Sequence, residues 1–155
     1  MATGEAVSAE IVLEGKPLTL LKPLTFMNLS GRAVAEAVEA KSIGRSEVMV
    51  VFDDVWLPLG TLRLRQRGSD GGHNGLASVI DALGGKDVPR LRIGIRPERV
   101  VDNLTDFVLA PFDGNELPAV DAALDHVVEA TRAVLTDGME RAMSRFNRPL
   151  ESERL

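Results

Sequence analysis

The sequence contains no cysteine and only two histidines, His73 and His126. Without cysteine it can form no disulfide bond and use no thiolate chemistry. Two histidines are too few for the multi-histidine ligand sets that hold catalytic zinc. We therefore expect a protein of a reducing compartment that works without a metal ion or another cofactor.

Long apolar segments are also missing from the chain. No window approaches the roughly 18 uninterrupted apolar residues that cross a bilayer. The opening residues, Met1–Glu5, have neither the basic nor the apolar region of a signal peptide. We expect a soluble, cytoplasmic protein without membrane contact. Its 155 residues, 45% of them hydrophobic, favour one globular domain over residues 1–155.

Charge is distributed unevenly along the sequence. The formal net charge of −5 disfavours a general nucleic-acid-binding protein. Residues 61–99 nevertheless carry eight basic and four acidic side chains, or +4, against ten basic and nineteen acidic ones elsewhere, or −9. A local phosphate-binding face would need such segregation, although ordinary solvated arginines explain the count equally well. The basic residues are Arg63, Arg65, Arg67, Lys86, Arg90, Arg92, Arg96 and Arg99.

Hydrophobic periodicity predicts alternating strands and helices. The expected strands are 10–13 and 18–21, which form a hairpin over 9–22, and 48–52, 61–67 and 91–95; the expected helices are 33–41, 75–83 and 117–136. This order predicts an α/β fold with a mixed β-sheet covered by helices. The chain ends, 1–7 and 151–155, are expected to fray.

Three of these elements carry predictions about burial. The continuous apolar run 48–52 is typical of a strand buried on both faces. Leucines alternating with arginines over 61–67 predict a half-buried strand with three arginines on one face. The last helix has an apolar stripe and ends at Gly138. The stripe comprises Val120, Leu124, Val127, Val128, Thr131 and Leu135.

Two adjacent carboxylates, Asp53 and Asp54, follow the 48–52 strand. Open α/β sheets bind ligands at the carboxyl ends of their strands, so Asp53 is the first candidate site residue, with Asp54 on the opposite face. One of the two can equally cap a turn. Spacing alone does not separate their roles.

The glycine-rich loop 68–75 lies between the basic strand and a helix. Its backbone N–H groups could approach a phosphate, but it matches neither a P-loop nor a dinucleotide fingerprint. His73 within the loop is either a base or, more commonly for a lone histidine, bonded to the loop backbone. Asn28 and Asn74 can each orient a carbonyl or a water, or serve the backbone of a turn.

The remaining notable side chains have structural interpretations. Trp56 is expected to pack rather than to stack on a base. Phe26 and Met27 belong by default to the core, although they can line a substrate pocket. His126 is expected on a solvated helix face.

Four ordered motifs carry a family resemblance over about residues 9–148. Residues 21–31 read Leu-Lys-Pro-Leu-Thr-Phe-Met-Asn-Leu-Ser-Gly, and residues 51–60 read Val-Phe-Asp-Asp-Val-Trp-Leu-Pro-Leu-Gly. Residues 71–76 read Gly-Gly-His-Asn-Gly-Leu, and Arg-Leu-Arg-Ile-Gly-Ile at 90–95 precedes Asp-Phe-Val-Leu at 106–109. Together they resemble the bacterial-type peptidyl-tRNA hydrolases.

The resemblance implies a twisted mixed sheet flanked by helices. It also implies a metal-free, monomeric esterase that cleaves the bond between a peptide and the tRNA 3′ ribose and so recycles tRNA during translation. By this resemblance Asp53 holds the catalytic histidine in its basic form. Asn28 and Asn74 position the peptide and the attacking water.

The same resemblance assigns binding roles. Phe26 lines the substrate pocket, and His73 lies beside the substrate without taking part in the chemistry. Arg65 and Arg92 match basic positions that the family uses to hold tRNA phosphate, which agrees with the local charge.

Two family segments have no counterpart in these 155 residues. They are a Gly-x-x-Asn-Pro-Gly loop after the first strand and a Thr-Arg-His-Asn segment whose histidine is the general base. We therefore expect a domain lacking the family's first strand and helix. Its activity should be impaired, since general-base catalysis contributes about 10²- to 10⁴-fold in rate. The alternative is a catalytically inactive RNA-binding relative, but the presence of Asp53, Asn28 and Asn74 favours the enzyme.

Overall fold

The computed structural model describes residues 2–3 and 5–147. The chain forms two compact units that alternate along the sequence. The first unit combines the chain up to Val50 with Gln66–Arg90, and the second combines Val51–Arg65 with the chain from Leu91 onward. The single domain expected from the length stays a prediction.

The first unit contains a three-stranded antiparallel sheet in the order β1-β2-β3. Its strands are β1 (Ala2–Thr3), β2 (Ala6–Leu13) and β3 (Lys16–Pro23). The two residues between β2 and β3 both have positive φ, 52° at Glu14 and 72° at Gly15. That conformation matches the right-handed twist of the flanking strands, so the predicted hairpin is confirmed.

The predicted fraying at the N-terminus was wrong for residues 2 and 3, which form β1, and for residues 6 and 7. Ala6 pairs with Pro23 and Val7 with Lys22, so the hairpin is longer than the alternation in the sequence suggested. Ala6 is only 5% exposed. Backbone hydrogen bonds between strands order this segment, and they cannot be read from the hydrophobic pattern of the sequence. The fraying predicted for 151–155 lies outside the described residues.

Two helices pack closely in the first unit. They are α1 (Ser30–Lys41) and α2 (Asn74–Leu83), and two short 3₁₀ turns, η1 (Met27–Leu29) and η2 (Arg45–Glu47), flank α1. A Cβ placed on Gly31 would lie 2.1 Å from the Ser78 carbonyl oxygen. The Gly31 N–H also donates to the Ser78 hydroxyl at 2.9 Å. The two helix backbones therefore meet at a position that only glycine can occupy without a shift.

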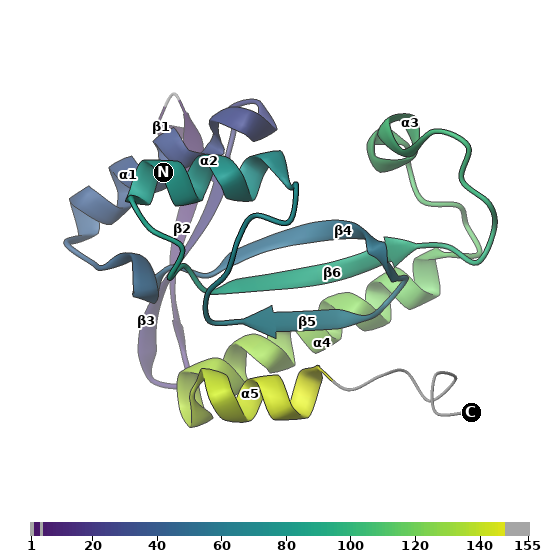
Figure 1. Ribbon diagram of the computed structural model, residues 1–155. Helices are drawn as coiled ribbons and strands as arrows, with labels where there is room; N and C mark the ends of the chain where they lie inside the picture. The colour runs from purple at the N-terminus through teal and green to yellow at the C-terminus, as the bar shows by residue number, and fades with distance from the viewer. Residues whose placement is uncertain (1, 4, 148–155) are drawn as a thin grey trace. The chain divides into compact units, whose positions relative to one another are not determined.

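The second sheet has the order β4-β6-β5. Its strands are β4 (Val50–Pro58), β5 (Leu62–Arg65) and β6 (Arg90–Arg96). Backbone bonds of 2.9 Å join Val50 to Pro89 and Leu59 to Arg96, a parallel register for β4 and β6. Strand β5 runs in the opposite direction to β6 (Figure 1). The expected α/β class with a mixed sheet is confirmed.

The second unit buries one face of this sheet. Leu62, Leu64 and Leu91 are at most 5% exposed, and the helices α4 (Leu117–Asp137) and α5 (Met139–Phe146) contact β5. The side-chain amide of Asn147 accepts from the Leu64 N–H at 2.6 Å and donates to the Leu64 carbonyl at 2.9 Å. It thereby pairs the backbone of β5 on the side away from β6.

Two burial predictions for the second unit were wrong. Val51 is 46% exposed, so β4 is not buried on both faces. In α4 the expected stripe was wrong at Leu124 and Val128, which are about half exposed, whereas its other four members are partly buried. The buried positions are Ala123, Ala130 and Ala133. Small side chains let this helix approach its neighbours closely.

Two helices were not predicted from the sequence. The short helix α3 (Leu104–Leu109) and the helix α5 had no counterpart in the expected elements. Within residues 2–3 and 5–147, no helix combines the length and the apolar character needed to span a bilayer.

We expect Gly31→Ala to lower the free energy of unfolding by about 1–3 kcal/mol, because the added methyl group overpacks the contact between α1 and α2. Urea unfolding followed by circular dichroism measures the change. Gly114→Ala is the matched control, since a Cβ at Gly114 has no neighbour within 4 Å. Equal losses from both substitutions would contradict the proposed close approach.

Candidate functional site

The two adjacent carboxylates, Asp53 and Asp54, lie in the middle of β4 and not after its carboxyl end, so their predicted position was wrong. They have different surroundings. Asp54 is 9% exposed, and its Oδ1 accepts from the Trp56 N–H at 2.8 Å. Its Oδ2 accepts from Arg92 Nε at 2.6 Å and also pairs with Arg92 Nη2. The half-buried Asp53 carboxylate has no partner among the described residues. The structure thus separates two residues that spacing left equivalent: Asp54 serves a turn and an ion pair, and Asp53 is available.

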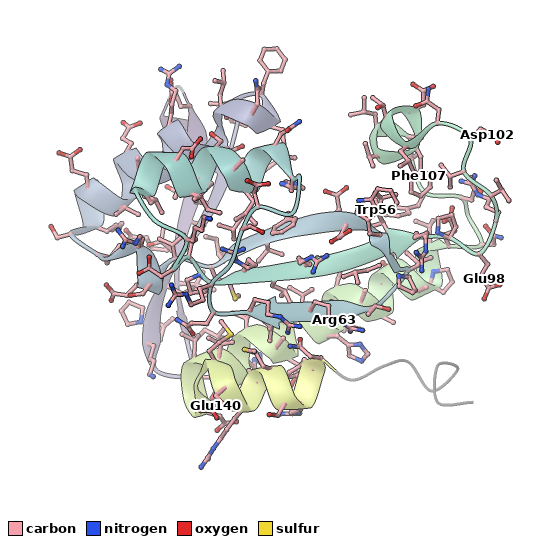
Figure 2. The ribbon with its side chains drawn as sticks, in the orientation of Figure 1. Trp56, Arg63, Glu98, Asp102, Phe107 and Glu140 are labelled. Carbon is pink, nitrogen blue, oxygen red and sulfur yellow. The ribbon has the colours of Figure 1, made fainter. Side chains whose placement is uncertain are left out.

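Arginines lie on the sheet face opposite the buried leucines. Because side chains alternate along a strand, Arg63 and Arg65 point away from the face that holds Leu62 and Leu64. Arg92 likewise alternates with the fully buried Leu91 on the neighbouring strand β6. Figure 2 shows Arg63 projecting from β5. We call these three arginines the basic face.

Strand β5 ends sooner than the sequence pattern predicted. Its last residue is Arg65, so Arg67 lies outside the strand and the expected row of three arginines is wrong. Arg63 and Arg65 each donate from Nη1 to the carbonyl of the preceding leucine, at 2.8 and 2.9 Å. Two arginines therefore line β5.

Arg90 was counted with the surface charge, but it is a buried structural residue. Arg90 is 3% exposed, and its side chain donates to four backbone carbonyls of the first unit. The acceptors are the carbonyl oxygens of Val88 at 2.9 Å, Ser69 at 2.8 Å, Gly68 at 3.0 Å and Lys86 at 3.1 Å. A guanidinium can satisfy several carbonyls at once because it carries five N–H donors. Arg90 therefore anchors the start of the glycine-rich loop and takes no part in the basic face.

Another arginine of the first unit is also structural. Arg45 Nε donates to Asp87 Oδ1 at 2.5 Å. This hydrogen bond holds the pKa of the exposed Asp87 carboxyl below its ordinary value.

His73 caps helix α2. Its Nδ1 accepts from the Leu76 N–H at 3.0 Å, three residues along the chain. A neutral imidazole has one acceptor nitrogen, and here the helix uses it. Nδ1 of His73 thus bonds to the backbone of the helix that follows the loop, not to the loop itself. A proton-accepting role at Nδ1 would break this cap.

The segments that carry Asn28 and Asn74 pack together. Turn η1 contacts α2, and a Cβ on Gly75 would lie 2.6 Å from the Met27 sulfur. The missing side chain at Gly75 therefore lets η1 approach the first turn of α2. Asn28 and Asn74 are both exposed, so their amides are open to a ligand.

Aromatic residues assigned to the core by default lie on the surface. Phe26 is 82% exposed and the adjacent Met27 55%. Trp56, shown in Figure 2, is 65% exposed. The packing predictions for these residues were wrong, since neither the η1 loop nor the end of β4 is covered within its own unit. His126 is exposed on α4, as expected.

The predicted site residues divide between the two units. Phe26, Asn28, His73 and Asn74 belong to the first unit, and Asp53, Arg65 and Arg92 to the second. No group of three His, Asp or Glu side chains is placed to hold a metal ion within the described part of the chain. Sequence reasoning missed the Asp54–Arg92 pair, because the partners are 38 residues apart and no local pattern links them.

Comparison with known proteins identifies the fold first. A crystal structure of peptidyl-tRNA hydrolase from Acinetobacter baumannii at 1.00 Å resolution matches with a TM-score of 0.82 and 29% sequence identity, covering 92% of this chain and 72% of that one. A peptidyl-tRNA hydrolase complex with N-propanol at 1.43 Å resolution matches with a TM-score of 0.83, 29% identity and the same coverage. The fold is therefore that of solved peptidyl-tRNA hydrolases.

Sequence comparison then identifies the family. The family model described as peptidyl-tRNA hydrolase matches residues 2–154. The peptidyl-tRNA hydrolase of Koribacter versatilis is 44% identical over 148 residues, which are 95% of this chain and 74% of the relative. That of Symbiobacterium thermophilum is 50% identical over 134 residues, 86% of this chain and 71% of the relative. The chain belongs to the peptidyl-tRNA hydrolase family.

His73→Ala should destabilise the protein by about 0.5–2 kcal/mol, the usual cost of removing a helix N-cap. His73→Asp should retain most of the stability, because an aspartate carboxylate accepts the same kind of N–H bond and favours the helix N-terminus. Thermal melts of the three proteins measure the difference. An aspartate variant as unstable as the alanine variant would argue against capping as the role of His73.

Proposed function

We propose that this chain binds peptidyl-tRNA and contributes to hydrolysis of the ester bond between the peptide and tRNA. The observation that carries the proposal is the difference between Asp53 and Asp54. A carboxylate that orients a catalytic imidazole must be able to accept its N–H. Asp54 already uses both oxygens, whereas Asp53 has no partner among the described residues.

The remaining roles follow from chemistry and exposure. Ester hydrolysis adds a water to the carbonyl carbon, passes a proton to a base and releases the ribose hydroxyl. The exposed amides of Asn28 and Asn74 can orient the peptide carbonyl and that water. Phe26 offers apolar surface to the peptide, and His73 lies in the same unit as a neighbour of Asn74.

Charge supports an RNA substrate for the second unit. Arg65 and Arg92 belong to the basic face, where guanidinium groups can bind phosphate. Translation is the process that supplies peptidyl-tRNA, so we place the protein in the cytoplasm. We further propose that it acts as a single-domain monomer without a metal ion.

A catalytically inactive RNA-binding relative was the alternative function, and no observation favours it. Asp53 has no structural role among the described contacts that would explain it without catalysis. The exposed amides of Asn28 and Asn74 likewise suit a reacting substrate better than a phosphate backbone.

Arg65→Ala and Arg92→Ala should each weaken tRNA binding to a similar extent across tRNA sequences. Each should flatten the dependence of log affinity on log salt by about one, because one phosphate contact is lost. Titration of labelled tRNA at several salt concentrations measures both effects. The control is Arg132→Ala, which changes a half-exposed arginine on α4. If neither Arg65→Ala nor Arg92→Ala changes the salt dependence of tRNA affinity, these arginines do not bind phosphate.

The 155-residue chain should hydrolyse peptidyl-tRNA about 10²- to 10⁴-fold more slowly than the Symbiobacterium thermophilum relative, because Nδ1 of His73 caps helix α2 and His126 lies exposed on α4. Added imidazole should raise the rate, and Asp53→Asn should prevent this rescue by removing the negative charge that stabilises the imidazolium.

Two outcomes would overturn this mechanism. His73→Ala should leave both the slow rate and the rescue in place, since Nδ1 of His73 serves the helix cap. A chain that turns over as fast as the relative, and that loses activity on His73→Ala, would show that the base is internal. Rescue that persists in Asp53→Asn would instead remove Asp53 from its proposed role.

A further inference from the structure

Asp54 is a buried carboxylate to which the proposed reaction gives no role. Both of its oxygens are engaged: Oδ1 by the Trp56 N–H at 2.8 Å, and Oδ2 by Arg92 at 2.6 Å from Nε. The bond to its own strand fixes the direction of the carboxylate. At 9% exposure, water competes little for either oxygen. Asp54 is therefore a rigid acceptor that faces β6.

The arginine that it holds keeps an open edge. A guanidinium has five N–H donors in one plane, and Asp54 takes those on Nε and on one side of Nη2. None of the described residues accepts from the other three, two of which, one on Nη1 and one on Nη2, form the Nη1–Nη2 edge. The Arg92 side chain is 35% exposed, so this edge can reach a ligand. An edge of two parallel N–H groups matches two oxygens of a phosphate.

We propose that Asp54 is a positioning residue that holds Arg92 with its Nη1–Nη2 edge directed at a phosphate of the bound RNA. The inference rests on the proposed function for the presence of an RNA substrate. In this arrangement the guanidinium group of Arg92 binds the Asp54 carboxylate with one edge and the phosphate with another. Asp54 itself does not touch the phosphate.

The direction in which one substitution changes the affinity for tRNA distinguishes this role from a general effect of charge. Asp54→Asn removes a negative charge beside the basic face, which by charge alone should tighten binding of a polyanion. The same change frees a flexible arginine side chain, whose ordering then opposes binding. For a preorganised guanidinium edge, loss of the anchor should weaken binding about three- to tenfold. A weaker complex in spite of the more favourable charge is the result that positioning predicts.

The experiment is a double-mutant cycle on binding of fluorescently labelled, unacylated tRNA at fixed salt. Asp54→Asn and Arg92→Ala should each weaken binding, and Asp54→Asn should add nothing once Arg92 is alanine. The matched control is Glu129→Gln, which removes the same charge from an exposed pair on α4 and should leave the affinity equal or slightly tighter. A salt titration adds a second readout, because Asp54→Asn keeps the arginine charge and should keep the salt slope that Arg92→Ala loses.

The results distinguish a failure of the proposed function from a failure of the positioning role of Asp54. If the unsubstituted chain does not bind tRNA, the proposed function fails. If it binds and Arg92→Ala weakens binding, but Asp54→Asn binds as tightly as Glu129→Gln, the positioning role alone is overturned. Losses that persist in the Arg92→Ala background would show a general structural effect and would also overturn it.

A second comparison applies if Asp54→Asn does not fold. Arg92→Lys keeps the charge, but an ammonium has no second planar edge, so it cannot present the same fork while paired to Asp54. It should therefore lose more affinity than Arg65→Lys, whose arginine bonds only to the carbonyl of Leu64 among the described contacts. Equal losses from the two lysine variants would overturn the positioning role.

Discussion

The mixed sheet depends on the absence of a side chain at Gly94, in the middle strand β6. A Cβ there would lie 2.0 Å from the Pro58 carbonyl oxygen. The same residue accepts from the Gly60 N–H at 3.1 Å and donates to Thr61 at 2.7 Å. The turn that leaves β4 can therefore fold directly onto β6 before β5 begins. The parallel pairing of β4 with β6 places Asp54 opposite Arg92.

The sheet in turn gives two neighbouring carboxylates different chemistry. Alternation along β4 directs Asp53 and Asp54 to opposite sides, so that only Asp54 meets the guanidinium of Arg92. Asp54 is thereby committed to Arg92 and to the Trp56 N–H, whereas Asp53 has no partner among the described residues. The division of labour comes from the strand register, because the two side chains are chemically identical.

Local signals in the sequence predicted the hairpin, α1, α2 and α4, since turn residues and helical periodicity act over a few positions. The helices α3 and α5, of six and eight residues, are too short for a helical period to repeat several times. The exposure of Trp56 and the burial of Arg90 could not be predicted, because each depends on contacts, or their absence, far along the chain. Arg90 bonds to Gly68, 22 residues away. For the site, resemblance supplied the candidate residues, but only the structure separated Asp53 from Asp54.

These contacts reduce the number of basic residues in the segment 61–99 that are available to bind phosphate. Of the eight basic residues in 61–99, Arg90 is buried against backbone carbonyls, and Arg92 carries Asp54 as a permanent counterion. The three arginines of the basic face together with Asp54 thus have a formal charge of +2. A face with so few charges offers few phosphate contacts, each worth about 0.9 in the salt slope. RNA binding at the basic face must therefore depend more on the orientation of each guanidinium group than on the electrostatic field of the whole protein. An otherwise acidic chain can in this way hold one region of an RNA without adhering to RNA in general.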